Sequence, residues 1–537
     1  MNQAEIIIKW KKYFENNKLI LKELIKYENI NLIETNFLSP CLIIDQHICA
    51  PWGVGLNKIN TLTVRNFLLT LVKNIEDLQE NDLIFIASDG TQKSDQLIKE
   101  LALVKLEKGS FVTFENFEGF DKKFVSETIK KIKAKCGFFL QSSIYDHNLI
   151  DVFFIDEFGE NYDQEFVEKI NQNALNNDYF DIPLNEKLDL FFVENDKMVK
   201  IFVDKIEQLY TRKLSTNKTK ITISNHNQGV TKILAKLLGH LDYSYVINNN
   251  VRPKNLFLSK TIDDREVELV YQKEIKFARK NRSNILVSFN QNGSRLMIFL
   301  IKRNNVVYLN QNLISLIFLN NFFNNLFLNN KKLTKSSIAS DYDPLPSIVN
   351  LINKYEIDFN ISKNISYDSQ NYLIFYWNTY NQFIFGEKRN VEFSIYNILI
   401  KLLEILNFAI LQTEGIQNLI ANIHMMYGHY LQIDAINDIS LNNLNLKINK
   451  IASDEKKWSE YKIKNIENFD TSKNHSEEIL WKIIFRNNDK FLIKYNHLIN
   501  KAIITYHFLV PPKKLFSNYK YFYVYEFKKI LKKILDY

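Results

Sequence analysis

Apolar runs and amphipathic stretches alternate along most of this chain. The run LIFIA at 83–87 predicts a strand, and the polar turn and mixed segment after it predict a helix over 94–106. The pattern continues as a strand over 110–115, a helix over 122–134 and a strand over 137–140. Strands that alternate with helices in this way are typical of α/β layer folds.

The same alternation restarts twice and then gives way to a shorter strand-rich end. The later predicted elements are strands over 219–224, 285–287, 306–309, 372–376, 490–493 and 503–509 and helices over 230–238 and 312–326. We therefore predict an α/β fold with three similar α/β domains and a smaller α+β C-terminal domain. The predicted boundaries are 1–184, 185–304, 305–436 and 437–537.

Length and composition favour a multidomain globular protein. The chain has 537 residues, of which 46% are hydrophobic, so large cores can be buried. Its 69 basic and 61 acidic side chains give a net charge of +8, a mild excess for this length. We therefore expect no nucleic-acid partner. Only 13 glycines occur, about a third of average usage, and an AT-rich genome would produce this bias by itself.

The three cysteines and the N-terminal segment indicate a reducing compartment. Cys41, Cys49 and Cys136 are too few and too scattered for a disulfide framework. The first 27 residues carry charges throughout and lack the apolar centre of a signal peptide. The sequence contains no run of about 18 apolar residues, so we predict no membrane-spanning helix. We expect a cytoplasmic protein without a transmembrane segment.

Four stretches, in order along the chain, carry a resemblance to a known family. They are GVGLNKINTLTVR at 53–65, IASDGTQKS at 86–94, LNQNLISL at 309–316 and IQNLIANIHMMYGHY at 416–430. They resemble the G-x-G-x-N-x-x-N…T-V-R, G-x-D-T-R-x-x-S, L-T-G-N-x-I-G-x-L and L-x-x-I-y-x-x-Y-G-x-Y segments of the α-D-phosphohexomutases, the phosphoglucomutase/phosphomannomutase class. The resemblance implies a four-domain architecture that covers nearly the whole chain.

The resemblance also implies a site for phosphoryl transfer between a serine and a sugar hydroxyl. Such a site needs an activated serine, a magnesium ion and cations on the substrate phosphate. Ser143, in QSSIYD at 141–146, falls at the phosphoserine position, but the histidine, asparagine and proline that follow the family's serine are replaced. A serine without a base or a metal is a poor nucleophile.

The metal loop D-P-D-A-D-R of the family corresponds to NQNGSR at 290–295. Asn290, Asn292 and Ser294 replace its three carboxylates, so the loop loses three negative charges. Magnesium prefers carboxylate oxygens in an octahedral shell, and we therefore expect no metal and no other cofactor. Arg295 is retained, and with Lys494 it is the remaining candidate contact for a phosphate.

The other loops that the resemblance places at the site are also altered. The segment DQHICA at 45–50 carries Cys49 where the family has an arginine. The sugar-binding loop, near 378–382, lacks the family's glutamates. The phosphate loop, near 494–500, retains only Lys494 as a cation.

From these losses the sequence predicts a pseudoenzyme, which acts as a structural or adaptor subunit bound to other protein subunits. A non-catalytic sugar-phosphate sensor and a divergent active phosphohexomutase are the alternatives. The C-terminal segment 511–537 mixes aromatic residues with lysines and predicts a basic amphipathic helix. That helix closes the last domain or, alternatively, docks on a partner or a membrane face.

Overall fold

The computed structural model of the chain separates into two compact units. Unit 1 comprises 1–205, 225–237 and 289–294, and unit 2 comprises 206–224, 238–288 and 295–537. The residues that the structure describes are 3–15, 21–22, 24–25, 39–44, 46–143, 148–208, 219–251, 261–262, 264–302, 306–328, 336–340, 343–361, 372–377, 383–385, 395–411, 415–453, 457–458, 461–468, 477–485, 489–496 and 501–510.

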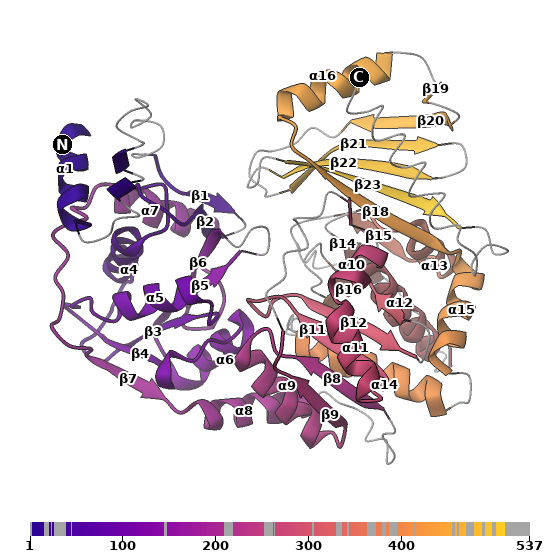
Figure 1. Ribbon diagram of the computed structural model, residues 1–537, viewed down its shortest axis with the longest axis horizontal. Coiled ribbons are helices and arrows are strands. Elements are labelled where there is room, and N and C mark those ends of the chain that lie inside the picture. Colours follow the sequence, from indigo (N-terminus) through magenta and orange to yellow (C-terminus); the bar gives the residue numbers. More distant parts are fainter. Residues whose placement is uncertain are drawn as a thin grey trace. The chain divides into compact units, whose positions relative to one another are not determined.

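Unit 1 is built on one seven-stranded sheet with the order β1-β2-β6-β5-β3-β4-β7 (Figure 1). Its strands are β1 (Leu42–Ile44), β2 (His47–Pro51), β3 (Leu83–Ser88), β4 (Ser110–Phe114), β5 (Cys136–Ser142), β6 (Leu149–Asp156) and β7 (Leu190–Val193). β3, β4, β5 and β7 run parallel to their neighbours in the β5-β3-β4-β7 part, whereas β1, β2 and β6 pair antiparallel. β7 ends the order and forms one edge of the sheet.

The core of unit 1 follows from period-two alternation in its strands. Ile150, Val152 and Phe154 of β6 point to one side and join a cluster with residues of β2, β3 and β5. The helices of this unit include α4 (Thr61–Asn74), α5 (Gln92–Leu101), α6 (Lys122–Ile132) and α7 (Gln164–Leu175). α6 and α7 begin at aspartate caps, Asp121 and Asp163, whose carboxylates accept the free amide hydrogens of the first turn.

The segment 53–65 performs a structural task in the fold. Asn60 caps α4: its Oδ1 accepts from the amides of Leu62 and Thr63, and its Nδ2 donates to the carbonyls of Gly53 and Gly55. Arg65 is 4% exposed and bonded to Glu100 of α5. The family-like residues Asn60 and Arg65 of this stretch therefore have a structural role.

Unit 2 contains two further α/β sheets. The five-stranded sheet has the order β13-β12-β11-β8-β9, and the four-stranded sheet has the order β15-β14-β16-β17. Their strands are β8 (Lys220–Ser224), β9 (Ser244–Asn248), β11 (Ile285–Phe289), β12 (Leu296–Ile301), β13 (Val306–Leu309), β14 (Ser336–Ser340), β15 (Asp358–Ile361), β16 (Tyr372–Trp377) and β17 (Phe383–Phe385). Parallel pairs form the centre of each sheet, and antiparallel strands lie at an edge.

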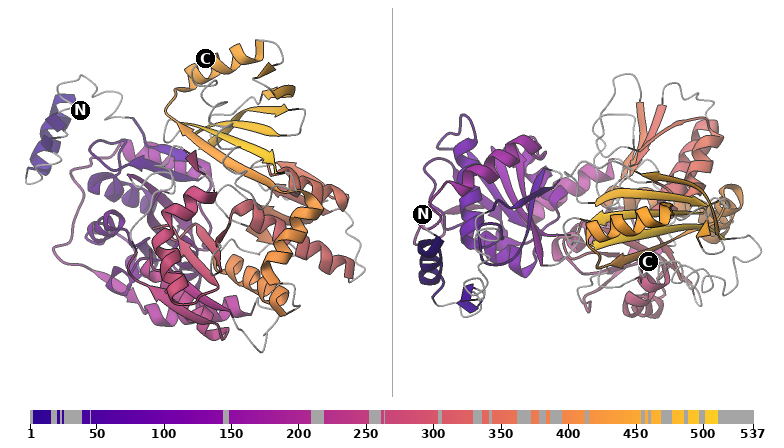
Figure 2. Two further views of the ribbon diagram at one scale, coloured as in Figure 1. Left: turned by 45° about the vertical axis from the view of Figure 1, so that its right-hand side comes forward. Right: turned by 90° about the horizontal axis from the view of Figure 1, so that it is seen from above.

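The rest of unit 2 is an antiparallel sheet with the order β10-β18-β23-β22-β21-β20-β19. Its strands are β10 (Thr261–Ile262), β18 (Tyr430–Asn437), β19 (Lys457–Trp458), β20 (Tyr461–Asn468), β21 (Glu477–Phe485), β22 (Lys490–Asn496) and β23 (Lys501–Leu509). Helix α16 (Leu441–Ser453) lies across one face, where Leu444 and Ile448 join the apolar core (Figure 2). The opposite face is polar although much of it is buried: Lys490, Lys494, Thr505 and His507 are each less than 9% exposed.

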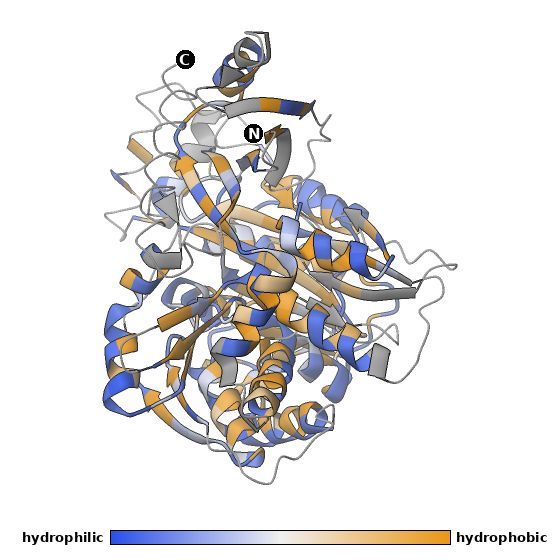
Figure 3. Ribbon diagram, turned by 90° about the vertical axis from the view of Figure 1, so that its right-hand side faces the viewer, coloured by the Kyte–Doolittle hydropathy of each residue, from blue (hydrophilic) through white to orange (hydrophobic). Residues whose placement is uncertain are grey.

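The remaining helices belong to both units. They are α1 (Gln3–Tyr13), α8 (Asn195–Glu207), α9 (Gln228–His240), α10 (Asp264–Val270), α11 (Gln272–Lys280), α12 (Gln311–Leu328), α13 (Pro346–Lys354), α14 (Ile395–Leu411) and α15 (Gly415–Tyr427). In Figure 3 the strands are mainly hydrophobic, and the helices carry hydrophilic residues along part of their length. Within the described residues, no helix combines the length and the apolar character needed to cross a bilayer.

The predicted fold class is confirmed, with three α/β sheets followed by an antiparallel sheet with its own helix. The helix predicted over 94–106 is shorter than expected. α5 ends at Leu101, because the chain turns there and Val104 forms a β-bridge with Leu184. The predicted C-terminal helix lies outside the described residues.

Candidate functional site

The loop 290–294 and the end of β5, next to the predicted phosphoserine position, contact each other in unit 1. Asn292, in the loop after β11, donates from Nδ2 to the backbone oxygen of Ser142 at 2.6 Å. Its Oδ1 accepts from the amide and the hydroxyl of Ser294, at 3.0 and 2.7 Å. Asn290 donates from Nδ2 to the Ser294 hydroxyl at 3.1 Å. The two segments are therefore fastened directly to each other by uncharged groups.

A third segment, the turn between β3 and α5, joins them through Asp89. One oxygen of this fully buried carboxyl accepts from the Ser142 amide at 2.7 Å. The other accepts from the amide and the hydroxyl of Thr91, at 3.0 and 2.7 Å. Burial raises the pKa of Asp89 from 3.8 to about 6, although these hydrogen bonds oppose the increase.

Asn227, at the start of α9, adds the fourth segment. Its Oδ1 caps the helix by accepting from the Val230 amide at 3.0 Å. Its Nδ2 donates to the backbone oxygens of Asp89 at 2.6 Å and Gln291 at 3.1 Å. The sequence analysis did not assign a role to Asn227, although an asparagine between a strand and a helical pattern is a recognisable capping signal.

Glycines allow these segments to approach each other at van der Waals distance. A Cβ on Gly119 would lie 2.0 Å from the backbone of Gly90, and one on Gly229 would lie 2.2 Å from the Gly119 carbonyl. Gly293 has φ +74° and packs on Val230 of α9. We call Gly90, Gly119, Gly229 and Gly293 the glycine junction. In a chain with 13 glycines, four lie at this one place.

The loop residues Asn290, Asn292 and Ser294 do not fit a magnesium ion. None of them supplies a carboxylate, and both polar atoms of Asn292 are engaged in hydrogen bonds within unit 1. A divalent cation of this size demands several negatively charged or strongly polar oxygens in octahedral geometry. We therefore derive no chemical step through a metal here.

Restoring the carboxylates provides a test of that statement. In the triple variant Asn290→Asp, Asn292→Asp, Ser294→Asp, the new acid at position 292 faces the Ser142 carbonyl oxygen and cannot donate to it. We expect the melting temperature without magnesium to fall by roughly 4–8 °C and to recover in part when magnesium is added. Calorimetry on both proteins measures this. A wild-type chain that magnesium stabilises as much as the variant would contradict the expectation.

The buried carboxyl of Asp89 predicts a second, pH-dependent effect. A folded-state pKa above the unfolded value means that the folded chain binds the proton more tightly, so its stability decreases as the pH rises from about 4 to about 6. The difference between the two pKa values corresponds to a change of up to about 3 kcal/mol in the free energy of unfolding. The stability advantage of wild type over Asp89→Asn should therefore be about 2 kcal/mol larger at pH 4.5 than at pH 7 in urea unfolding. An advantage that does not change with pH would contradict the assignment.

Ser143 directly follows β5 and is 8% exposed. Its amide donates to the Leu149 carbonyl at 3.0 Å, and its hydroxyl lies beside the Cys49 thiol. Burial, followed by the nearby Asp151, raises the pKa of Cys49 well above its usual value, so this thiol is not a ready nucleophile. The positions after Ser143, at 144–146, lie outside the described residues.

The two candidate phosphate contacts belong to unit 2. Arg295 directly precedes β12, and Lys494 lies in β22 with 8% exposure. Lys494 is thus a strand residue on the buried polar face of the C-terminal sheet. The segments 378–382 and 497–500 and residue Asp45 lie outside the described residues.

Comparisons with known proteins show where the fold occurs. Neither a protein-family model nor a curated protein sequence matches the chain. Among solved structures, it is similar to one described as a phosphomannomutase of Thermus thermophilus, with 12% identity, a TM-score of 0.59 and coverage of 87% of this chain and 95% of that one.

Two further solved structures have a similar fold. Parafusin, an exocytosis-sensitive phosphoprotein and phosphoglucomutase of Paramecium, is 13% identical with a TM-score of 0.60 and coverage of 88% and 91%. A phosphoglucomutase/phosphomannomutase family protein of Burkholderia thailandensis is 11% identical with a TM-score of 0.57 and coverage of 92% and 98%.

These comparisons correct one conclusion drawn from the sequence, namely that the chain is not an enzyme. The solved structures that share its fold are described as phosphohexomutases, and the replacement of loop residues does not by itself establish inactivity. The resemblance noted in four short stretches, in contrast, is confirmed at the level of the fold. The chain has the fold of the α-D-phosphohexomutases.

Proposed function

We propose that the chain serves as a structural or adaptor subunit of a larger protein assembly. The observation that carries the proposal is an exposed apolar segment of unit 1, defined by Leu184, Leu188, Phe191 and Phe192. Their exposed fractions are 43%, 49%, 60% and 54%. Exposed large apolar side chains that follow one another along a segment can mark a protein interaction site, and aromatic residues often dominate the binding energy there.

The loop network of unit 1 supports the same proposal. Asn292, Asp89 and Asn227 hold four segments together through direct hydrogen bonds. Because these bonds are within the chain, the arrangement needs no bound metal or sugar to maintain it. A fold held in this way can present an outer surface to other subunits.

A replacement experiment in the cells that make the protein tests this function. The gene is exchanged for one that encodes Ser143→Ala, and a second strain lacks the chain. We expect the assembly to keep its mass and composition with Ser143→Ala and to dissociate without the chain. Loss of hexose-phosphate interconversion in the Ser143→Ala strain, with the assembly unaffected by removal of the chain, would contradict the proposal.

A cavity in unit 1 favours a second candidate, a sugar-phosphate-binding protein. It has a volume of about 450 Å³ beside the Asp89 turn, and its lining includes Asp95, Glu118, Gln291 and Lys232. Carboxylates and amides suit sugar hydroxyls, and Lys232 offers a cation, although Glu118 and Asp196 already pair with it. Calorimetric titration with glucose 1-phosphate and glucose 6-phosphate tests this candidate, and the absence of heat would reject it.

A further inference from the structure

Strand β7 is an apolar edge that carries an exposed aromatic ring on each side. It pairs parallel to β4, with Val112 opposite Phe191 and Thr113 opposite Phe192. Because successive strand residues point to opposite faces, the two phenylalanines lie on opposite faces of the sheet. The Phe192 ring lies 6.1 Å from the Phe117 ring in an edge-on arrangement.

The outer edge of β7 offers backbone groups to another strand. In a parallel pair, alternate residues direct both the N–H and the C=O to the neighbour, and the others direct theirs away from it. No strand of the described residues lies beyond β7 in the sheet order (Figure 1). An apolar edge of this kind is a template for pairing with an added strand.

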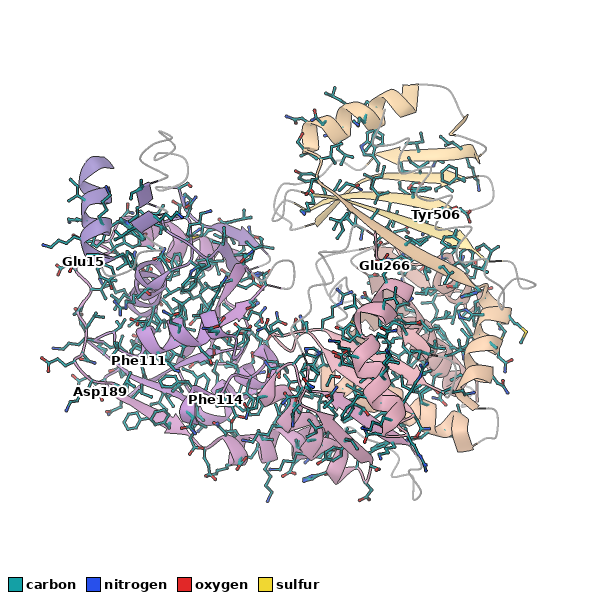
Figure 4. All side chains as sticks on the ribbon, in the orientation of Figure 1. Glu15, Phe111, Phe114, Asp189, Glu266 and Tyr506 are labelled. Atoms are coloured by element: carbon teal, nitrogen blue, oxygen red, sulfur yellow. The ribbon has the colours of Figure 1, made fainter. Side chains whose placement is uncertain are left out.

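Charge at the two ends of β7 selects between partners. Asp189 precedes the strand and Glu194 follows it, and both are exposed. Asp189 lies at the outer margin of unit 1, whereas Phe111 and Phe114 of β4 lie inside (Figure 4). A second copy paired antiparallel about Phe191 or Phe192 would place its Glu194 opposite a residue next to Asp189, and its Asp189 opposite a residue next to Glu194. Such a pair would bring like charges close together at both ends, which disfavours it.

We propose that β7 binds an extended apolar segment of a different protein, with lysine or arginine at both ends of that segment, by strand addition. The basic ends lie opposite Asp189 and Glu194, and the apolar centre packs beside Phe191 and Phe192. This inference rests on the proposed function, because it specifies which surface of the subunit meets its partner and what chemistry the partner carries.

Site-specific photo-crosslinking in the cells that make the protein tests the inference. The full chain carries Phe191→p-benzoylphenylalanine, and a matched control carries the same group at Phe158, which is 67% exposed in the turn between β6 and α7. Mass spectrometry identifies the peptide that is joined to each position. We expect position 191, but not position 158, to join to an extended apolar segment with basic ends.

Charge reversal distinguishes the proposed strand pairing from nonspecific association of exposed apolar side chains, because only the former depends on Asp189 and Glu194. Asp189→Lys with Glu194→Lys should lower the cross-link yield at position 191 about tenfold, and Asp189→Asn with Glu194→Gln should lower it less. A cross-link to β7 of a second copy, or a yield that charge reversal leaves unchanged, overturns the inference. If position 191 gives no cross-link while the chain still migrates in a large assembly, the edge proposal fails and the proposed function stands. If the chain migrates alone, the proposed function fails as well.

Discussion

Gly119→Ala should lower the free energy of unfolding of unit 1 by about 3 kcal/mol or more. The added methyl group would lie 2.0 Å from the Cα and N of Gly90 and 2.5 Å from the carbonyl carbon of Asp89. These are backbone atoms, so the clash cannot be relieved by rotating a side chain. The β3–α5 turn must move, which weakens the bonds of Asp89 to Ser142 and Thr91. Urea unfolding with hydrogen exchange of unit-1 peptides measures the loss.

Gly239→Ala is the matched control for this substitution. Gly239 lies in α9, and the nearest atom to its added Cβ is a ring carbon of Tyr245 at 4.0 Å. Because alanine is the better helix former, the control should be neutral or more stable by up to about 1 kcal/mol. Equal effects of the two substitutions would show that the glycine junction is not closely packed.

Lys490→Met should destabilise unit 2 by about 3 kcal/mol or more. Lys490 Nζ donates to Asp343 Oδ2 at 2.6 Å and to the Pro344 carbonyl at 2.7 Å, on the buried polar face of the C-terminal sheet. Burial lowers the pKa of Lys490, and Asp343 opposes that decrease. Removal of the lysine leaves a buried carboxylate whose remaining cationic partner among the described residues is Lys482, at 3.5 Å. Thermal unfolding compared with wild type gives the size of the effect.

Two further variants show whether the buried charge is the cause. The double variant Lys490→Met, Asp343→Leu removes both charges and should regain much of the stability. Lys401→Met breaks a pair with Glu404 in which the lysine is 41% exposed, and it should cost less than about 1 kcal/mol. A double variant that is less stable than Lys490→Met would contradict this explanation.

The alternating pattern was sufficient to predict the class of fold, because buried parallel strands such as β3 and β5 are short uninterrupted apolar runs. It did not reveal the polar face of the C-terminal sheet. Lys490, Lys494 and His507 would be assigned to a solvated face from sequence, and only the contact with Asp343, 147 residues away, shows that this face is covered. Contacts between distant segments leave no periodic signal in a single sequence.

The candidate site was predicted in part. The four family-like stretches located Ser143 and the loop 290–294, and the structure brings Asn292 to Ser142 within one unit. The role of Asp89 was missed, since the local sequence does not distinguish a buried carboxyl from one in an exposed turn. The role of Asn227 was missed although its place between a strand and a helical pattern is a capping signal. The step from altered loops to an inactive protein was wrong, because residue replacement describes a site and does not measure its activity.

The most direct test of the central claim is the native mass of the untagged protein in a gentle lysate of its own cells, with the co-migrating proteins identified and counted. A subunit of an assembly predicts a particle well above the 63.6 kDa of one chain, with other polypeptides in fixed ratio to it. A single species at 63.6 kDa that contains only this chain would contradict the claim.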